Sequence, residues 1–383
     1  MTLLDESTWR GKIYRAGWTA GAAGEVAVTE PATGEEIGRI GCAGPSDVAA
    51  AAARAAAAQP AWAATPHTER AAILRRAADL WLANAAEIEG WVVRESGKIP
   101  PAAQFETHNS TGEIYEAATL PSRPYGELLP SEQPRLSYAE RRPVGVVGVI
   151  APFNFPQILS VRSVAPALAL GNAVILKPDL RTSVCGGVVL ARIFEEAGLP
   201  EGLLHVLPGG VDVGEAVVTE PLVRVISFTG STAAGRKVGE LAGRHLKRVH
   251  LELGGNSALV ILDDADLDLA ASAGAWGSFL HQGQICMTTG RHLVQDAVYD
   301  DYVARLAEKA VHLPVGNPAT EQVALGPIID ERQRDKVHEL VTASVDAGAR
   351  LAAGGTYEGL FYQPTVLADM APQIGRASCR ERV

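Results

Sequence analysis

Three features are scarce in this 383-residue sequence: aromatic residues, cysteines and long apolar runs. Aromatic residues make up 5% of it, so a core must be built mainly from Ala, Val, Leu and Ile. The best apolar stretch, residues 143–152, is far too short to cross a bilayer, so we expect no membrane partner. The first nine residues carry acidic side chains and no apolar segment, which argues against a signal peptide.

Cysteine spacing and charge exclude two further classes of protein. The four cysteines (Cys42, Cys185, Cys286 and Cys379) do not show the spacing of metal ligands, so we expect no metal site. Reduced thiols of this kind fit a cytoplasmic protein best. The net charge is −10 and the sequence contains no cluster of basic residues, so we expect no nucleic-acid partner.

The pattern from residue 144 onward alternates strand and helix and predicts a doubly wound parallel sheet of the α/β class. The segment VGVVGVIAP is continuously apolar, as in a strand buried on both faces. The expected strands are 144–152, 171–178, 203–209, 224–230 and 248–255. Expected helices between them cover 163–170, 182–197, 212–218 and 231–241, and further helices at 46–59, 67–85 and around Ile88 form an N-terminal layer.

The length favours more than one domain, and composition suggests where they divide. Residues 121–142 are rich in Pro and contain an alternating stretch, which predicts a projecting β-hairpin. A second α/β unit begins after Gly255. We therefore expect a first domain made of residues 1–120 and 143–254, and a second, incomplete domain at 255–373.

The last ten residues, IGRASCRERV, have no periodicity. They can be encoded by a DNA string that looks like a sequencing-library adapter, and the preceding FYQPTVLADM reads like a strand that leads into more fold. We therefore expect 374–383 to be a non-native tail and the natural protein to continue beyond Gln373. The alternative is an ordinary charged, frayed terminus.

Three side chains carry the candidate chemistry. Cys286 lies in HQGQICMTTGRH, where a polar loop meets a helix; a reactive thiol is one interpretation and a packed core cysteine the other. Glu252 ends an expected buried strand, where burial would raise its pKa toward that of a general base; a satisfied structural carboxylate is the alternative. Asn154 in APFNFP is either a turn residue or an amide donor to an oxyanion.

Two further segments suit a nucleotide. FTGSTAAGRKVGE places Gly230, Ser231 and Gly235 between an expected strand and helix, a helix start that suits a pyrophosphate. The spacing is not GxGxxG, which argues against the common dinucleotide fold. Lys177 ends another expected strand and is either a solvated cation or a donor to cofactor hydroxyls or phosphate.

The segments APFNFP, ILKP, FTGSTAAG, LELGG and GQICMTTGR, in this order, resemble the aldehyde dehydrogenase superfamily over about residues 29–370. The resemblance implies Cys286 as nucleophile, Glu252 as general base, and Asn154 with the Cys286 N–H as the oxyanion hole. It also implies an NAD or NADP cofactor in the first domain. The implied cofactor contacts are Ile150, Ala151, Pro152, Phe153, Lys177, Asp179, Arg181, Gly209, Gly210, Gly230, Ser231, Gly235 and Leu253.

The finer resemblance is to benzaldehyde and related aryl-aldehyde dehydrogenases, which implies an aromatic aldehyde substrate. Leu159, Arg162 and Ile285 would then face the substrate. Many NAD-preferring members have a Glu at the position that Leu180 occupies, and Arg181 follows it here. We therefore predict that NADP is accepted beside NAD, with Arg181 able to pair with a 2′-phosphate.

The family's E-x-F-G-P segment, which contacts the nicotinamide ribose, does not occur in the sequence. We therefore expect the 383-residue chain by itself to be poorly soluble and weakly active. The alternatives to an aldehyde dehydrogenase are a coenzyme-A-acylating or purely esterolytic relative, a non-catalytic relative that kept the fold, and an inactive fragment of the parent enzyme. By the same resemblance, the hairpin at 121–142 makes the parent enzyme a homodimer or homotetramer.

Overall fold

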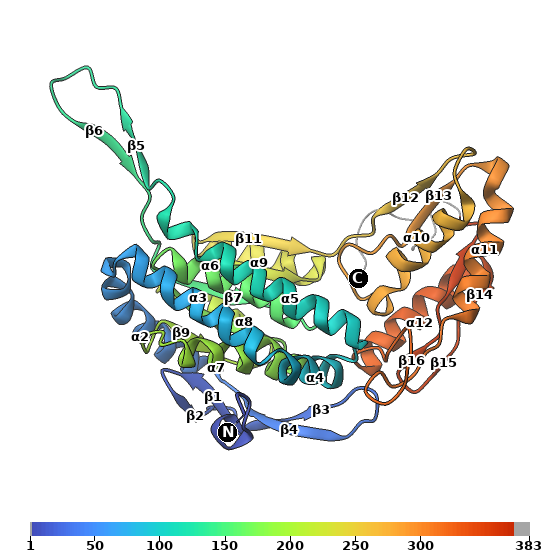
Figure 1. The fold of residues 1–383 in the computed structure, drawn as a ribbon, viewed down its shortest axis with the longest axis horizontal. Helices are drawn as coiled ribbons and strands as arrows, with labels where there is room; N and C mark the ends of the chain where they lie inside the picture. Colours follow the sequence, from blue (N-terminus) through green and yellow to red (C-terminus); the bar gives the residue numbers. More distant parts are fainter. Residues whose placement is uncertain (1, 371–383) are drawn as a thin grey trace.

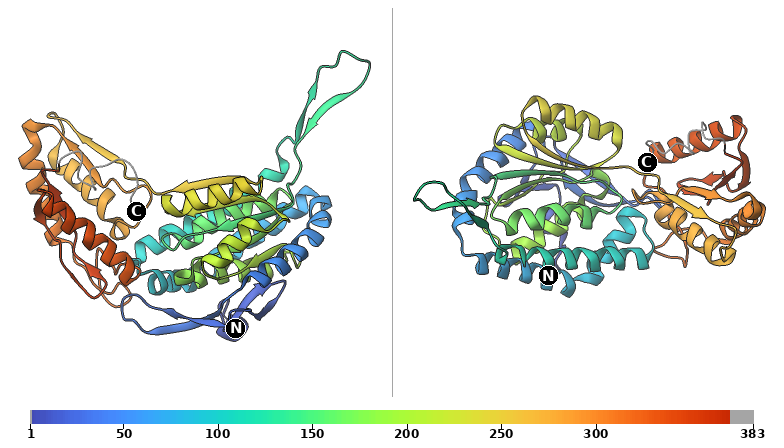
Figure 2. Two further views of the ribbon diagram at one scale, coloured as in Figure 1. Left: turned by 180° about the vertical axis from the view of Figure 1, so that it is seen from behind. Right: turned by 90° about the horizontal axis from the view of Figure 1, so that it is seen from above.

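The computed structural model describes residues 2–370, which form two lobes and one projecting arm (Figure 1). The first lobe holds the large sheet and most of the helices, and the second lobe holds the later part of the chain. Figure 2 shows the two lobes side by side, joined at the end of β11 (Arg248–Leu253). The expected tail at 374–383 lies outside the described residues.

The first lobe is built on a seven-stranded sheet in the order β11–β10–β7–β8–β9–β1–β2. The five strands from β11 to β9 pair in parallel, which confirms the doubly wound parallel core. The central strand β7 is buried at every position because helices cover both of its faces. The parallel strands after β11 are β10 (Val223–Gly230), β7 (Val146–Ile150), β8 (Ala173–Lys177) and β9 (Leu204–Val206).

Helices cover the sheet on two faces, as the alternating sequence pattern predicts. One face carries α2 (Pro45–Ala64), α8 (Val211–Thr219) and α9 (Thr232–Arg244). The other carries α6 (Pro156–Ala169), the π-helical turn η3 (Val184–Val188) and α7 (Val189–Glu196). An outer layer of α3 (His67–Ala83), α4 (Ala85–Ser96) and α5 (Pro100–Ala117) packs on that second group.

Sequence reasoning missed the strands near the N-terminus. After the short helix α1 (Glu6–Trp9), β1 (Lys12–Arg15) pairs antiparallel with β9 and extends the sheet, followed by β2 (Trp18–Ala20). β3 (Glu25–Thr29) and β4 (Glu36–Gly41) form a separate antiparallel ribbon. These strands are short and only partly buried, so they lack the continuous apolar signal of the central strands.

The expected hairpin is present and extends away from the first lobe (Figure 1). It follows the short turn η1 (Leu120–Ser122) and consists of β5 (Gly126–Leu129) and β6 (Ser137–Glu140), paired antiparallel. Its residues are almost all exposed, and apolar side chains are among them: Leu128 and Leu136 are each 76% exposed.

The second lobe confirms a second α/β unit after Gly255. β12 (Ala258–Ile261) pairs in parallel with β13 (Arg291–Val294) across α10 (Leu267–Phe279) and the turn η4 (Leu280–Gly283). The turn η5 (Asp296–Val298), α11 (Tyr299–His312) and α12 (Glu331–Asp346) follow. The remaining strands are β14 (Arg350–Ala353), β15 (Tyr357–Glu358), β16 (Phe361–Tyr362) and β17 (Val366–Ala368). Within residues 2–370, no helix has the length and apolar character that crossing a membrane requires.

Candidate active site at the carboxyl edge of the sheet

The carboxyl ends of four parallel strands meet at one edge of the large sheet. Lys177 at the end of β8 lies opposite Ile150 at the end of β7. Leu253 on β11 lies opposite Gly230 on β10, and Glu252 precedes Leu253. Ligands of open α/β sheets bind outside this edge. The register therefore brings together segments from Ile150 to Leu253, which are 253 − 150 = 103 positions apart in the sequence.

The turn between β10 and α9 has the shape of an anion site. Ser231 is the N-cap of α9, and its hydroxyl accepts a hydrogen bond from a first-turn N–H group at 3.3 Å. A Cβ atom on Gly235 would lie 2.3 Å from the side chain of Leu253, and one on Gly230 would lie 2.7 Å from the ring of Phe228. A side chain at either position would require the Leu253 or Phe228 side chain to move, and the open helix start suits a pyrophosphate.

Lys177 ends β8, and the glycine pair Gly209–Gly210 follows the neighbouring strand β9 and precedes α8. The half-buried ammonium of Lys177 reaches the Pro178 carbonyl oxygen at 3.4 Å, which is a long contact, and burial lowers its pKa. Gly210 is the N-cap of α8, and a Cβ atom on Gly209 would lie 2.4 Å from the side chain of Val213. A half-buried ammonium with only a long contact suits hydroxyl groups of a ligand, so these residues fit a dinucleotide.

Residues 150–154 connect β7 to α6 and lie at the same carboxyl edge of the sheet. We call residues 150–153 the cofactor wall, because the expected cofactor contacts include them. Ile150 and Ala151 are buried, whereas Pro152 and Phe153 are half-buried. The side chain of Asn154 is buried, and its Nδ2 donates a hydrogen bond to the Gln284 carbonyl oxygen at 2.9 Å. Asn154 is thus tied to the loop that carries Cys286, although 130 residues separate Asn154 and Gln284.

The loop before Cys286 has an uncommon backbone. His281, Gln282 and Gly283 have φ values of 50°, 56° and 70°, so three successive residues lie in the left-handed region. Each of the two non-glycine residues costs about 1–3 kcal/mol in such a conformation, which the surroundings must offset. The His281 ring is buried and packs edge-on against Phe155 with ring centroids 5.7 Å apart. Sequence analysis did not single out His281.

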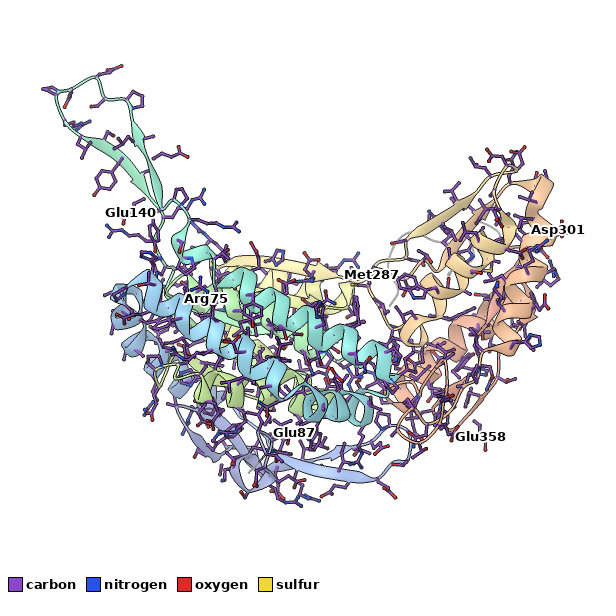
Figure 3. All side chains as sticks on the ribbon, viewed as in Figure 1. Arg75, Glu87, Glu140, Met287, Asp301 and Glu358 are labelled. Carbon is purple, nitrogen blue, oxygen red and sulfur yellow. The ribbon has the colours of Figure 1, made fainter. Side chains whose placement is uncertain are left out.

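Cys286 is exposed and lies next to the residues that follow β11. A Cβ atom on Gly255 would lie 2.7 Å from the Cys286 carbonyl oxygen, so the glycine permits this close approach. The Ser257 N–H donates to the Thr288 carbonyl oxygen at 3.0 Å and joins the same two segments. Figure 3 labels Met287, the next residue, at the junction between the two lobes.

The prediction that Glu252 is buried was wrong. β11 is the edge strand of the sheet, and the side chain of Glu252 is 62% exposed. Its carboxylate lies 3.1 Å from Nε2 of His250, on the same face of the strand. β11 alternates: Leu251 and Leu253 are half-buried against α9, whereas His250 and Glu252 are exposed. The carboxylate of Glu252 is therefore open to solvent.

Arg181, the expected partner of a 2′-phosphate, is engaged by two carboxylates. Its Nε and Nη2 each donate to Asp179 at 2.8 Å, and its Nη1 donates to Asp330 at 2.6 Å. The guanidinium also lies over the Phe153 ring, 4.3 Å from the centroid. Burial opposes ionisation of Asp179, but the hydrogen bonds and charge of Arg181 outweigh it and lower the pKa of that carboxyl group. A 2′-phosphate would have to compete with both carboxylates.

The expected substrate residues are divided between the surface and the core. Leu159 is half-buried on α6, and Ile285 is buried beside Cys286. Arg162 is exposed and forms an ion pair with Glu113 at 3.2 Å. Its charge is thus already balanced at the surface of α6.

A buried ion pair behind Asn154 was also missed. Lys98 and Glu106 have fully buried side chains and form a hydrogen-bonded ion pair. The Lys98 ammonium lies 3.8 Å from the centroid of the Phe155 ring, and a Glu106 oxygen accepts from the Gln157 N–H at 2.8 Å. Lys98 lies between α4 and α5 and Glu106 lies on α5, and nothing in their spacing distinguishes a buried pair from an exposed one.

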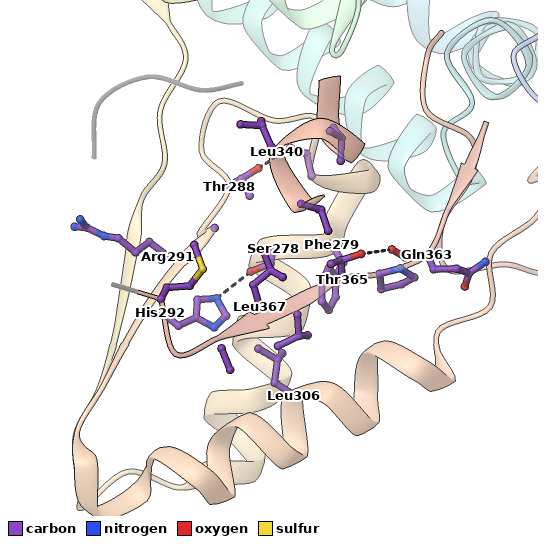
Figure 4. A pocket seen from close by; sticks show the side chains of 18 of the residues that line it. Ser278, Phe279, Thr288, Arg291, His292, Leu306, Leu340, Gln363, Thr365 and Leu367 are labelled. Atoms are coloured by element: carbon purple, nitrogen blue, oxygen red, sulfur yellow. Dashed lines mark hydrogen bonds between the residues drawn. The ribbon is translucent and has the colours of Figure 1, made fainter. Parts of the chain in front are cut away.

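A cavity of about 680 Å³ in the second lobe borders the Cys286 loop through Gln284 and Thr288 (Figure 4). In its wall, His292 Nε2 contacts the Ser278 hydroxyl at 2.9 Å and the Thr289 carbonyl oxygen at 2.8 Å. Because a carbonyl only accepts, Nε2 carries the proton and cannot serve as a base for Ser278. The Ser–His pair therefore holds β13 to α10 and is not a second nucleophilic site.

Comparisons with known proteins agree with this geometry. A family model described as the aldehyde dehydrogenase family matches residues 18–378. A vanillin dehydrogenase of Amycolatopsis sp. is 70% identical over 98% of the chain and 77% of its own length. A benzaldehyde dehydrogenase [NAD(+)] of Pseudomonas putida is 50% identical over 97% of the chain and 76% of its own length. The crystal structure of an NAD-dependent benzaldehyde dehydrogenase from Corynebacterium glutamicum superimposes with a TM-score of 0.92 at 41% identity, over 98% of this chain and 82% of that one.

Proposed function

The chain belongs to the aldehyde dehydrogenase family, and from this premise we propose that it oxidises an aromatic aldehyde to the carboxylic acid with NAD or NADP. The observation that carries the proposal is the junction around Cys286. There, an exposed thiol lies on a loop held by Asn154 from β7 and packed against Gly255, three residues beyond Glu252. A nucleophile, an amide donor and a carboxylate thus come to one edge of the sheet.

The first step is attack by the Cys286 thiolate on the aldehyde carbonyl, which forms a C–S bond and a tetrahedral oxyanion. Two donors would stabilise this oxyanion: the Cys286 N–H and the Asn154 amide. One Asn154 N–H group holds the Gln284 carbonyl oxygen, and the other remains to donate to the oxyanion.

The oxyanion then collapses to a thioester and expels hydride. NAD or NADP, when bound, accepts this hydride. The residues of the chain that would hold the cofactor are the α9 start with Gly230, Ser231 and Gly235, the Lys177 ammonium, and the wall at residues 150–153. Asp179 and Arg181 would support that wall and not contact the cofactor phosphate directly.

The last step is hydrolysis. Glu252 takes a proton from a water molecule, the water oxygen attacks the thioester carbonyl, and the C–S bond breaks to release the acid and the Cys286 thiol. The exposure of Glu252 gives water direct access to its carboxylate. A carboxylate in this role favours hydrolysis and argues against transfer of the acyl group to coenzyme A.

An aromatic substrate is supported by the names of the relatives, which act on vanillin and benzaldehyde. Leu159 on α6 and the buried Ile285 would provide the apolar contacts for an aromatic ring. Arg162 is paired with Glu113, so we assign it to the outer end of the substrate path.

A single-turnover assay tests the proposed function. The protein is mixed with benzaldehyde or vanillin and with NAD or NADP, and reduced cofactor is measured at 340 nm per Cys286 thiol. We expect a burst that disappears in Cys286→Ala and persists in the matched control Cys42→Ser. Activity that survives in Cys286→Ala, or faster turnover of short aliphatic aldehydes than of benzaldehyde, would contradict the proposal.

We also infer that the protein assembles into a homodimer or homotetramer in the cytoplasm. The hairpin β5–β6 supports this inference because it presents Leu128, Leu136 and Tyr138 to solvent with no covering element among the described residues. Its two strands pair only with each other within residues 2–370, so each has an edge that another chain could extend.

A further inference from the structure

Arg181 joins the two lobes at the cofactor edge of the sheet. It lies in the short turn η2 (Leu180–Thr182) just after β8, whereas Asp330 is the N-cap of α12 in the second lobe. One Asp330 oxygen accepts from the Arg181 guanidinium at 2.6 Å, and the other accepts from the Gln333 N–H at 2.7 Å. Asp330 thus caps the N-terminus of α12 and also holds α12 to Arg181 of the first lobe.

The Arg181–Asp330 ion pair belongs to a closed series of contacts, which we call the contact ring. Arg181 covers the ring of Phe153, and Asp330 follows Ile329, whose N–H donates to the Gln284 side-chain oxygen at 3.2 Å. The Gln284 carbonyl oxygen accepts from Asn154, the residue after Phe153, which closes the series.

The contact ring connects groups that the proposed reaction needs at the same time. Phe153 belongs to the expected cofactor wall, Asn154 is the proposed oxyanion donor, and Gln284 lies two residues before Cys286. The same loop contains His281 and Gln282 in left-handed conformations, so it needs external contacts to keep its shape. A shift of Asp330 would therefore move the contacts of both Phe153, through Arg181, and Gln284, through Ile329.

We propose that Arg181 and Asp330 are positioning residues whose ion pair couples the cofactor wall at Phe153 to the loop that carries Cys286. The inference rests on the proposed function for the identity of the cofactor and the nucleophile. It also gives Arg181 a role other than phosphate binding, because three of its nitrogen atoms and one face of its guanidinium are already engaged within the protein.

Asp330→Asn is the sharpest test variant. Asparagine is as good an N-cap as aspartate, so the start of α12 is preserved while the charge that pairs with Arg181 is removed. The matched control is Asp266→Asn. Asp266 caps α10 in the same way and has no hydrogen bond to a residue of the contact ring. Arg181→Gln and the double variant complete a mutant cycle, and Arg181→Lys restores the charge without the planar fork.

Two measurements are made on each protein. Site-resolved mass spectrometry gives the rate at which iodoacetamide alkylates Cys286, with and without saturating NAD. Calorimetry gives the dissociation constants of NAD and NADP. In the wild type we expect NAD to change the alkylation rate about fivefold, within the usual range of coupling between sites. Asp330→Asn should reduce that ratio to below about twofold, alter the rate without cofactor, and weaken NAD binding about threefold to fivefold.

The mutant cycle gives the decisive outcome. Arg181→Gln should act like Asp330→Asn, the double variant should be no worse than either, and Arg181→Lys should recover part of the ratio. Alkylation rates in Asp330→Asn that match those of the wild type and of Asp266→Asn would overturn the proposal. So would a loss of NADP binding in Arg181→Gln with NAD unaffected, together with tighter NADP binding in Asp330→Asn, because Arg181 would then be a phosphate ligand. If the wild type bound neither nucleotide, the proposed function would fail, and the alkylation rates without cofactor would still decide this inference.

Discussion

At the scale of single residues, Asn154 has two tasks. One N–H group of its amide holds the Gln284 carbonyl oxygen, and the proposed task of the other is to stabilise the oxyanion on the substrate. Replacing such a side chain can therefore lower kcat in two ways, by removing a donor to the oxyanion and by loosening the loop. Variants of Asn154 therefore need a control that loses only an ordinary amide hydrogen bond.

We predict that Asn154→Ala lowers kcat about 10²–10³-fold, the usual cost of losing one oxyanion donor. The control is Asn109→Ala, because the Asn109 amide donates to the Phe105 carbonyl oxygen on an exposed helix face and lies outside the site. Steady-state kinetics with benzaldehyde measures both variants. Equal kcat values for Asn154→Ala and the wild type would remove Asn154 from the oxyanion hole.

His205 gives a prediction about stability against pH. Its ring is fully buried on β9, and burial lowers its pKa from 6.5 to about 4. Between these values the unfolded chain takes up a proton that the folded protein refuses, so stability falls as the pH falls from 6.5 toward 4. The loss is on the order of 3 kcal/mol when complete.

Urea unfolding at a series of pH values measures this effect. In His205→Gln, where the amide can still donate to the Gly202 carbonyl oxygen as the ring nitrogen does, the free energy of unfolding should fall less steeply below pH 6.5. The difference in slope isolates His205 from the other buried histidines. Parallel curves for the variant and the wild type would show that His205 is protonated in the folded protein.

At the scale of elements, the sequence predicted the strands that helices cover on both faces. β7 and β8 are continuously apolar and therefore leave a clear pattern. β11 also contains apolar residues, but they alternate with polar ones because only one face is covered. That alternation was the available sign that Glu252 is exposed, and the expectation of a buried general base overlooked it.

The features of the site that could not be predicted from the sequence are contacts between residues far apart along the chain. The segments that carry Cys286, Asn154 and Glu252 could be identified from their residue types and spacing, and the structure brings those segments to one junction. The engagement of Arg181 by Asp330 depends on the packing of two lobes across 149 residues. The left-handed run at His281 and Gln282 likewise has no clear local sequence signal, because positive φ is uncommon for any residue other than glycine.

The hairpin is the element with the most direct consequence for assembly. Leu128 and Tyr138 lie opposite each other in its register, and Leu136 immediately precedes β6. We predict that Leu128→Ser combined with Leu136→Ser lowers the molar mass of the assembly in light scattering. Leu246→Ser is the control, since Leu246 is 95% exposed and lies outside the hairpin, between α9 and β11. An unchanged mass in the hairpin variant would assign assembly to another surface.

At the scale of the whole molecule, the proposed reaction lies where the two lobes meet. The first lobe contributes Asn154, Glu252 and the proposed cofactor residues, and the second contributes the loop with Cys286. Neither lobe holds the complete set of groups. The relative position of the lobes therefore determines whether thiol, amide and carboxylate face the same substrate carbonyl.

Chemical quench of Glu252→Gln with benzaldehyde and NAD tests this account most directly. We expect one turnover of reduced cofactor, followed by a benzoyl group on the Cys286 peptide that persists because water is no longer activated. The adduct should be absent from the Cys286→Ala double variant. Wild-type turnover in Glu252→Gln without any acyl group on Cys286 would contradict the central claim that Cys286 carries the thioester and Glu252 releases it.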